Sequence, residues 1–219
     1  MPKPTFFNLP AAKRDTIIDL AVEEFSQHTY RQASLSRIVQ RAGIAKGSIY
    51  QYFDNKLDLY RWLITEHITA RKMVAISASA PPPDASIWVV LETAYLAGFR
   101  FVLAEPRLAA LGTRFIRDTS DPAVRAIAAQ NRGASDAWLR ALVQRAVDAG
   151  DVRAGVDVEL AVGLLTLTLG EGMLELMARR LGLDFGALLE DPAATSQLTE
   201  QDVRELVRGV IGFLKSGLG

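Results

Sequence analysis

A short polar segment in the first quarter of the chain carries the side chains best suited to contacting another molecule. Lys46, Ser48 and Gln51 are expected on one side of a helix whose other side holds the apolar Ile49. Each helical residue advances by about 100°, so the apolar residue faces inward and the polar residues face outward. Gly47 has no side chain and lets a partner approach closely. Such a face suits DNA, where some side chains contact base edges and others bind phosphates.

The neighbourhood of this face is cationic and rich in hydroxyls. Tyr50 and Tyr52 flank it, and Lys56 follows. Between residues 30 and 61, six basic side chains accompany two acidic ones, although the whole chain is neutral, with 25 of each. A lysine in the first turn of a helix is unfavourable by about 1 kcal/mol at most, and an anionic partner would account for Lys46. The local charge therefore favours nucleic acid as the partner.

Three predicted helices position the segment. The first covers residues 11–27 and buries a stripe of Ile17, Ala21 and Phe25. The second is opened by Ser34 and repeats apolar residues at helical spacing: Leu35, Ile38, Val39 and Ala42. Gly43 stands where a helix C-cap favours a left-handed residue, and a third helix is predicted from about residue 46 through Phe53. Two short helices separated by a glycine turn form a helix-turn-helix.

Residues 34–56, SLSRIVQRAGIAKGSIYQYFDNK, resemble the DNA-binding signature of the tetracycline-repressor (TetR) family in composition, order and spacing. The resemblance implies groove-facing positions at Ser36, Lys46, Gly47, Ser48 and Gln51. It implies phosphate contacts at Ser34, Tyr50, Tyr52 and Lys56. The alternatives are that Tyr52 packs in the core and that Ser36 is plain surface. Two residues depart from the family pattern: Ala45 replaces a frequent serine or threonine cap, and Thr29 replaces a glycine.

The rest of the chain is also predicted to be helical, because no run alternates as a half-buried strand does. We expect an all-α protein with a helix-turn-helix domain at residues 1–55 and a larger helical domain for ligand binding and dimerisation at 56–219. Residues 1–10 are predicted to form a loose arm. Further helices are expected at about 56–77, 84–105, 107–117, 121–149, 157–180 and 199–215, with a loop and a short helix at 181–198.

A helical region of about 160 residues exceeds what is needed to support a DNA-binding head. The resemblance implies that it senses a small apolar or amphipathic effector. Aromatic residues with occasional polar partners could line an apolar cavity: Trp88, Glu92, Tyr95, Phe99, Arg114, Phe115, Asn131 and Trp138. The alternative is that these aromatics are ordinary core.

Two apolar helices suggest a homodimer. The candidate interface residues are Ala161, Leu165, Leu169 and Met173 in the helix over 157–180, and Val207, Val210 and Leu214 in the last helix. Pairing them with a second copy would form a four-helix interface, whereas the alternative is an intramolecular core. A dimer would place two recognition helices in successive major grooves of a palindromic operator, and a ligand that changed their spacing would release a repressor.

Several classes are disfavoured. The chain has no cysteine and two histidines, and it lacks a phosphate-binding glycine loop and the HExxH motif, so we expect no enzyme, metal site or cofactor. Its longest uncharged apolar run, Leu160–Gly170, is eleven residues, too short to span a membrane, and a cytoplasmic location is expected. Two alternatives stay open: a helical scaffold whose helix-turn-helix no longer binds DNA, and an all-α enzyme with a carboxylate pair.

Overall fold

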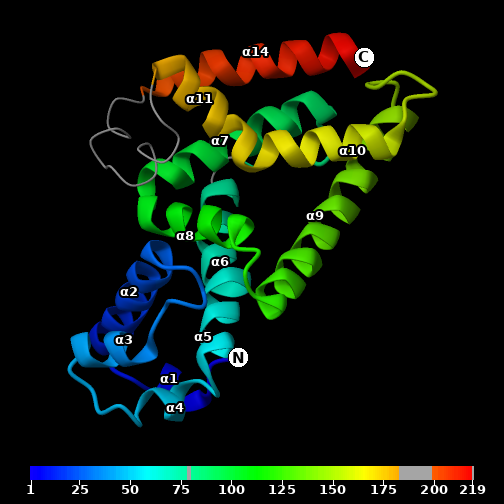
Figure 1. Cartoon of the computed structure of the whole chain (residues 1–219). Helices are drawn as coiled ribbons and strands as arrows, with labels where there is room; N and C mark the ends of the chain where they lie inside the picture. The colour runs from blue at the N-terminus through cyan, green and yellow to red at the C-terminus, as the bar shows by residue number, and fades with distance from the viewer. Residues whose placement is uncertain (78–79, 183–198, 219) are drawn as a thin grey trace. The chain divides into compact units, whose positions relative to one another are not determined.

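The computed structural model of the chain describes residues 1–77, 80–182 and 199–218 (Figure 1). All regular structure in these ranges is helical, which confirms the predicted all-α class. The chain divides into two compact units. Unit 1 comprises Met1–Arg71 and Arg107–Gln130, and unit 2 comprises Lys72–Pro106 and Asn131–Gly219.

Unit 1 combines the N-terminal helices with a later stretch of chain. Its elements are α1 (Pro4–Phe7), α2 (Ala11–Gln27), α3 (Leu35–Arg41), α4 (Ile49–Tyr52), α5 (Lys56–Trp62), the π-helical turn η1 (Leu63–His67), the start of α6 (Ile68–Ser77), nearly all of α8 (Pro106–Arg117) and the start of α9 (Pro122–Asp148). The predicted stripe on α2 is buried. At its end the rings of Phe25 and Tyr60 lie 4.8 Å apart, and Phe115 lies 6.2 Å from Tyr60.

Polar contacts also fasten α8 to the N-terminal helices. The Arg114 guanidinium donates to the Ser26 carbonyl at 2.6 Å, and the Tyr30 N–H donates to the buried Asp118 carboxylate at 2.6 Å. The predicted boundary after residue 55 therefore falls inside unit 1, because α5 and α8 complete the core around α2. The assignment of separate tasks to residues 1–55 and 56–219 stays a prediction.

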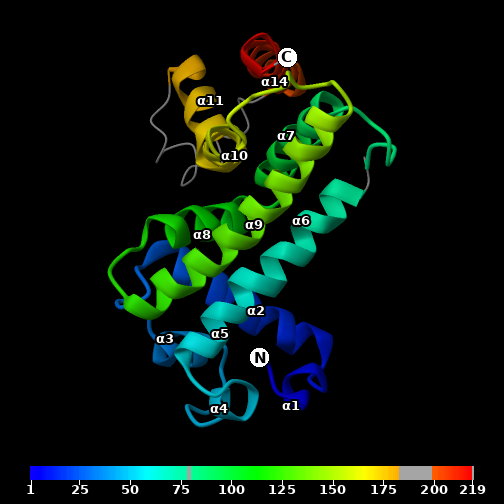
Figure 2. The ribbon, with the colours of Figure 1, turned by 90° about the vertical axis from the view of Figure 1, so that its right-hand side faces the viewer.

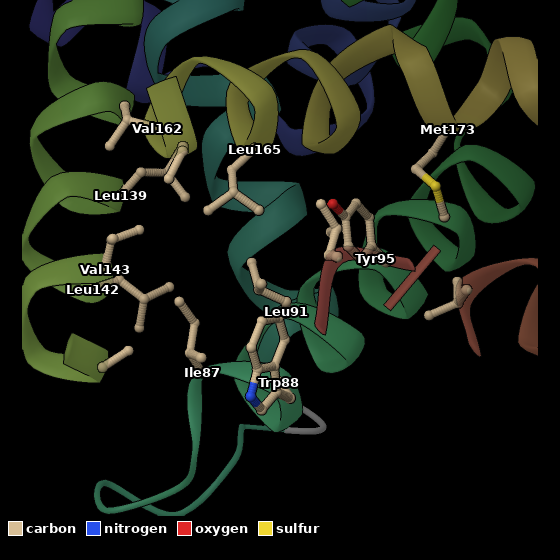
Figure 3. Packing of buried hydrophobic residues seen from close by; sticks show 14 of the residues in the cluster. Ile87, Trp88, Leu91, Tyr95, Leu139, Leu142, Val143, Val162, Leu165 and Met173 are labelled. Atoms are coloured by element: carbon tan, nitrogen blue, oxygen red, sulfur yellow. The ribbon is translucent and has the colours of Figure 1, made fainter. Parts of the chain in front are cut away.

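Unit 2 contains the remainder of α6 and α9, and it also contains α7 (Ile87–Ala104), α10 (Val158–Leu167), the π-helical turn η2 (Thr168–Gly172), α11 (Met173–Leu181) and α14 (Glu200–Leu218). Its core gathers side chains from several of these helices, among them Leu91 of α7, Val143 of α9 and Leu165 of α10 (Figure 3). Helices α10 and α14 run side by side in Figure 1 and are seen nearly end-on in Figure 2.

The prediction of a single helix over residues 157–180 is wrong at the centre of that range. It begins as predicted at Asp157, whose carboxylate accepts the Leu160 N–H at 3.0 Å. Gly170 then adopts a non-helical conformation (φ −86°, ψ −128°) inside η2. A Cβ at Gly172 would lie 2.5 Å from the Leu167 carbonyl oxygen, so glycine is required there. The two glycines thus permit a kink between α10 and α11.

The last described helix begins as the sequence indicated. The Thr199 N–H donates to the Asp202 carboxylate at 3.3 Å, and the Asp202 N–H donates to the Thr199 hydroxyl at 3.2 Å, before α14 starts at Glu200. This is the reciprocal arrangement of a capping box. The loop and short helix predicted for 181–198 lie, from residue 183 onward, outside the described residues.

Two stretches are long and apolar enough to span a membrane by length and composition, Ile87–Ala104 and Val158–Arg180. The structure buries 44% of the first window and 28% of the second. Core packing in unit 2 accounts for the composition of α7. The second stretch keeps several leucines exposed, which requires a separate explanation.

Candidate nucleic-acid interface

The predicted helix-turn-helix forms in unit 1 from α3, a turn and α4 (Figure 1). At the start of α3 the Ser34 hydroxyl accepts the Arg37 N–H at 3.4 Å, as an N-cap does. At its end Gly43 takes a φ of +64°, and the Ile44 N–H donates to the Val39 carbonyl at 3.1 Å. This left-handed C-cap turns the chain toward α4, as predicted.

The α4 helix is shorter than predicted because the segment before it is wound more tightly. The α-helix covers Ile49–Tyr52 rather than starting near residue 46. The Ser48 N–H donates to the Ala45 carbonyl at 2.8 Å, and the Gln51 N–H donates to the Ser48 carbonyl at 3.0 Å. These bonds reach back three residues, as in a 3₁₀ turn. Ala45 offers no side-chain cap, and Gly47 disfavours an α-helix by about 1 kcal/mol.

The two faces of this segment differ as the sequence indicated. Ile49 and Phe53 are each 1% exposed and form the underside. The outward side holds most of the predicted DNA contacts: Ser36, Lys46, Gly47, Tyr50 and Gln51 are exposed, and Ser48 is half-buried. These side chains offer one cation, two hydroxyls besides that of the tyrosine, and an amide. Such a set can donate to and accept from both base edges and phosphates.

Tyr52, predicted to contact phosphate, is 6% exposed. Its ring lies 6.0 Å from that of Phe6, and the backbone of α4 points it inward with Ile49. Its position matches the alternative that Tyr52 packs in the core.

Lys56 is also predicted to contact phosphate, but its ammonium forms hydrogen bonds within unit 1. Its ammonium donates to the carbonyls of Tyr30 at 2.7 Å and Ala33 at 3.0 Å, and it lies 4.5 Å from the centre of the Tyr30 ring. Burial lowers the pKa of Lys56, and the negative charges of Asp121 and Glu24 partly oppose this shift. The structure therefore gives Lys56 the role of a clamp on the loop before α3, and its phosphate contact stays a prediction.

A buried carboxylate holds α3 against α2. Glu24 is 4% exposed and accepts the Ser34 N–H at 2.7 Å and the Arg37 Nε–H at 3.0 Å. Burial tends to raise the pKa of Glu24, but the hydrogen bonds from Arg37 and from the Ser34 N–H outweigh it, so the pKa is lowered. Ser34, which is half-buried, thus uses its N–H inside the unit, and its hydroxyl accepts the Arg37 N–H at the start of α3.

The prediction of a loose arm at residues 1–10 is wrong. Residues 4–7 form α1, and Phe6 is fully buried beside Phe53 and Trp62. Lys3 and Thr5 contact backbone carbonyls of α4. A sequence signal was available, since the paired aromatics Phe6 and Phe7 are unusual in a solvated arm.

Comparisons with known proteins agree with this architecture. The family described as "Bacterial regulatory proteins, tetR family" matches residues 17–62, which include α2, α3 and α4. A TetR-family transcriptional regulator from Chloroflexus aurantiacus J-10-FL has a similar structure, with a TM-score of 0.78 and 29% identity over 100% of this chain and 98% of that chain. Residues 17–62 therefore match the tetR family, and the whole chain has a fold similar to that of a TetR-family regulator.

Sequence similarity to known regulatory proteins covers only a minor part of the chain. The "Fatty acid metabolism regulator protein" of Bacillus subtilis (strain 168) is 46% identical over 50 residues, which are 23% of this chain and 26% of that protein. The "Probable acrEF/envCD operon repressor" of Escherichia coli (strain K12) is 34% identical over 67 residues, covering 26% of this chain and 30% of that protein. The chain therefore matches less than a third of the length of these two relatives.

The residues predicted to line an effector pocket are divided between the two units. Arg114 and Phe115 belong to unit 1, where they contact Ser26 and Tyr60. The other six belong to unit 2: Trp88, Tyr95 and Phe99 are buried in its core, Glu92 and Asn131 are half-buried, and Trp138 is 51% exposed. The buried three match the alternative of ordinary core, and the pocket stays a prediction.

The predicted dimer residues lie mostly inside unit 2. Ala161, Leu165, Met173, Val207 and Leu214 are buried, while Leu169 and Val210 are half-buried. The first five therefore offer little surface to a partner. The neighbouring residues Leu160, Leu164, Leu167, Leu176 and Phe213 are exposed instead, and we call them the α10–α14 face. Leu160, Leu164 and Leu167 also follow helical spacing, so the sequence contained a second stripe on the same helix.

Proposed function

We propose that the chain is a DNA-binding transcriptional regulator, and that it acts as a dimeric repressor released by a small effector. The observation that carries the proposal is the helix-turn-helix of unit 1, whose apolar underside is buried and whose outward side is polar. A packing hairpin would not need an exposed Lys46 and Gln51 beside a glycine. The family match over residues 17–62 supports the same function.

In the proposed complex the turn before α4 and α4 itself enter the major groove. Gln51 and Ser48 can pair with base edges, because an amide and a hydroxyl each donate and accept. Lys46 and Tyr50 lie beside them and can bind phosphate or guanine. The space around Gly47 is open, since even an added Cβ would meet no heavy atom within 4 Å, and this leaves room for the sugar-phosphate backbone.

The test is selection of bound duplexes from a random DNA pool by the purified full chain at near-physiological salt. Recovery of an inverted repeat is the expected result, and recovery of nothing above background would favour the scaffold alternative. On the selected duplex, Gln51→Ala should change the preferred sequence, whereas Lys46→Ala should weaken binding to all sequences and reduce its salt dependence. Equal, sequence-independent losses from both would show that the groove-facing residue is wrongly assigned.

The dimer is proposed to form through the α10–α14 face. The face is built from large apolar side chains, of which Phe213 is 81% exposed, Leu167 69% and Leu160 60%. Apolar hollows lie between α10 and α14 and are lined by Leu164, Phe213 and Leu214. A second copy of the same face would bury these side chains, and its two-fold symmetry would match an inverted repeat in DNA.

Sedimentation of the purified protein tests this arrangement. Leu164→Glu should convert a dimer to a monomer, because it would bury a charge in the interface. Leu103→Glu is a matched control, since Leu103 is 39% exposed on α7 and Leu164 is 42% exposed on α10. A monomeric wild type, or a Leu164→Glu protein that stays dimeric, would contradict the proposal. Co-sedimentation with lipid vesicles would instead point to a membrane as the partner of this face.

The effector is proposed to be small and apolar or amphipathic, and to bind in the helical region of unit 2. The name of the B. subtilis relative refers to fatty acid metabolism, and a solved structure of FadR from B. subtilis is in complex with stearoyl-CoA, so a long-chain acyl-CoA is the first probe. If the effector acts in this way, saturating probe weakens operator binding, and saturating operator weakens probe binding by the same factor. Unequal factors would contradict a single coupled equilibrium. A regulator of chromosomal DNA would act in the cytoplasm, which is part of the proposal.

A further inference from the structure

The carbonyl groups at the end of α4 pose a problem that the helix itself does not solve. A helix leaves its last four carbonyls without partners from the helix. In α4 one of these, that of Ile49, accepts the Phe53 N–H at 2.9 Å. The chain then extends at Phe53, so the helix continues no further. The carbonyls of Tyr50, Gln51 and Tyr52 must find donors elsewhere.

Residues preceding α2 supply a donor to each of the three. The Lys3 ammonium donates to the Tyr50 carbonyl at 2.9 Å, and the Lys3 N–H donates to the Tyr52 carbonyl at 2.8 Å. The Thr5 hydroxyl donates to the Gln51 carbonyl. The N-terminal segment therefore caps the end of α4 completely, from a position more than forty residues earlier in the chain.

An aromatic anchor fixes this segment in place. Phe6 is fully buried, with its ring centre 4.9 Å from that of Phe53 and 5.5 Å from that of Trp62. Phe53 directly follows α4, and Trp62 belongs to α5. Figure 1 shows α1 beside α4 in unit 1. The cap is thus joined to the core of the unit as well as to the helix that it closes.

The contribution of the cap matters because α4 is a single turn. Helices this short are not stable alone, since nucleation fixes several residues for each hydrogen bond gained. A cation near the C-terminal carbonyls also favours the helix dipole. We propose that Lys3, Thr5 and Phe6 are positioning residues that hold α4 in its DNA-binding conformation, an inference that rests on the proposed function.

This role differs from direct contact with DNA. The Lys3 ammonium is engaged by the Tyr50 carbonyl and by the Asp54 carboxylate at 2.8 Å, so its charge is already paired. A lysine that binds phosphate contributes about 0.9 to the slope of log affinity against log salt. A positioning lysine leaves that slope unchanged and lowers the affinity for the specific site.

The experiment compares Lys3→Met with Lys46→Met in the full chain, on the selected duplex and on a random duplex. Lys3→Met should weaken specific binding by about tenfold at an unchanged salt slope, and Lys3→Arg should restore it. Lys46→Met should reduce the slope. Lys13→Met removes an equal charge from an exposed site on α2 and should have no effect on specificity. A reduced slope for Lys3→Met, or unchanged specific binding, would overturn the inference.

Amide hydrogen exchange provides a readout that needs no DNA. Lys3→Met and Thr5→Val should each speed exchange at Gln51 and Phe53, whose N–H groups close α4, while exchange in α2 stays unchanged. Unchanged protection at these amides would overturn the cap even if a specific duplex is found. If no duplex is found but protection is lost, the proposed function fails while the capping of α4 stands.

Discussion

Replacing Glu24 by glutamine tests how the DNA-binding head is held together. The buried carboxylate accepts the Ser34 N–H at 2.7 Å and the Arg37 Nε–H on both oxygens, at 3.0 and 3.1 Å. It therefore fixes the start of α3 to α2. Glutamine has the same size but carries one acceptor oxygen and an NH₂ group, which would face the Arg37 guanidinium. The substitution keeps the volume and removes the charge and the two-pronged geometry.

The expected loss of stability in Glu24→Gln follows from the burial of the carboxylate. Breaking a buried ion pair by removing one partner costs about 3–5 kcal/mol. The Arg37 side chain is 47% exposed, so water can replace part of what it loses. The discounted cost is about 2–3 kcal/mol of unfolding free energy. For a protein of this size, that lowers the midpoint of thermal unfolding by roughly 5–10 °C.

The neighbouring residue supplies the control. Glu23 pairs with Arg41 at 2.9 Å, but its side chain is 24% exposed against 5% for Glu24. An exposed pair contributes about 0.5 kcal/mol, so Glu23→Gln should shift the midpoint by about 2 °C at most. Scanning calorimetry of the two variants and the wild type makes the comparison. Equal shifts for the two substitutions would refute the claim that burial of Glu24 gives its ion pair special weight.

The same carboxylate predicts a pH dependence. Its pKa in the folded state is lowered from the ordinary value of 4.5, so the folded protein releases this proton more readily than the unfolded chain does. Its contribution to stability is therefore complete above about pH 4.5 and is lost as the pH falls through the lower folded value. Between these limits the wild type should lose more stability than Glu24→Gln. A parallel decline of both proteins would contradict the assignment.

Two further substitutions test individual contacts. Lys56→Met removes the ammonium that clamps the Tyr30 and Ala33 carbonyls, and it should lower the free energy of unfolding by about 2 kcal/mol with an unchanged salt slope of DNA binding. A salt slope reduced by about 0.9 would instead support the phosphate contact that the sequence predicts for Lys56. Gly172→Ala places a Cβ against the Leu167 carbonyl and should lower the free energy of unfolding by about 2 kcal/mol. In Gly133→Ala, on α9, the added Cβ meets no heavy atom within 4 Å, so the free energy of unfolding should rise by about 0.5–1 kcal/mol. Urea unfolding measures both. Equal effects of the two substitutions on stability would show that the backbone of η2 shifts to accommodate the Cβ.

Local signals made the head of this protein predictable from its sequence. The Ser34 cap, the left-handed Gly43 and the apolar spacing along α2 and α3 each act within a few residues, and the structure contains all of them. The extent of α4 was harder, because Ala45 and Gly47 weaken its start and a distant segment closes its end. Periodicity alone could not supply the contribution of Lys3.

The helix α10 shows a second limit. It is apolar on more than one side, so two stripes satisfy helical spacing. Leu165 belongs to the buried stripe and Leu164 to the exposed one. Only the packing of α7 and α9 decides which stripe is core (Figure 3). The sequence pattern therefore identified an apolar helix, but it could not distinguish the buried stripe from the exposed one.

The excess of basic residues counted along the sequence also overstates the positive charge that a DNA partner would contact. Of the basic residues between 30 and 61, Arg37 and Arg41 pair with Glu24 and Glu23, which precede that window, and Arg31 lies 3.6 Å from Asp121, far along the chain. Folding thus neutralises much of the local excess with carboxylates that a sequence window omits. Lys46 stays exposed on the outward side. In the proposed complex, specific binding would then depend on hydrogen bonds from a few positioned polar groups, so the groups proposed to position α4 would matter as much as those proposed to face the groove.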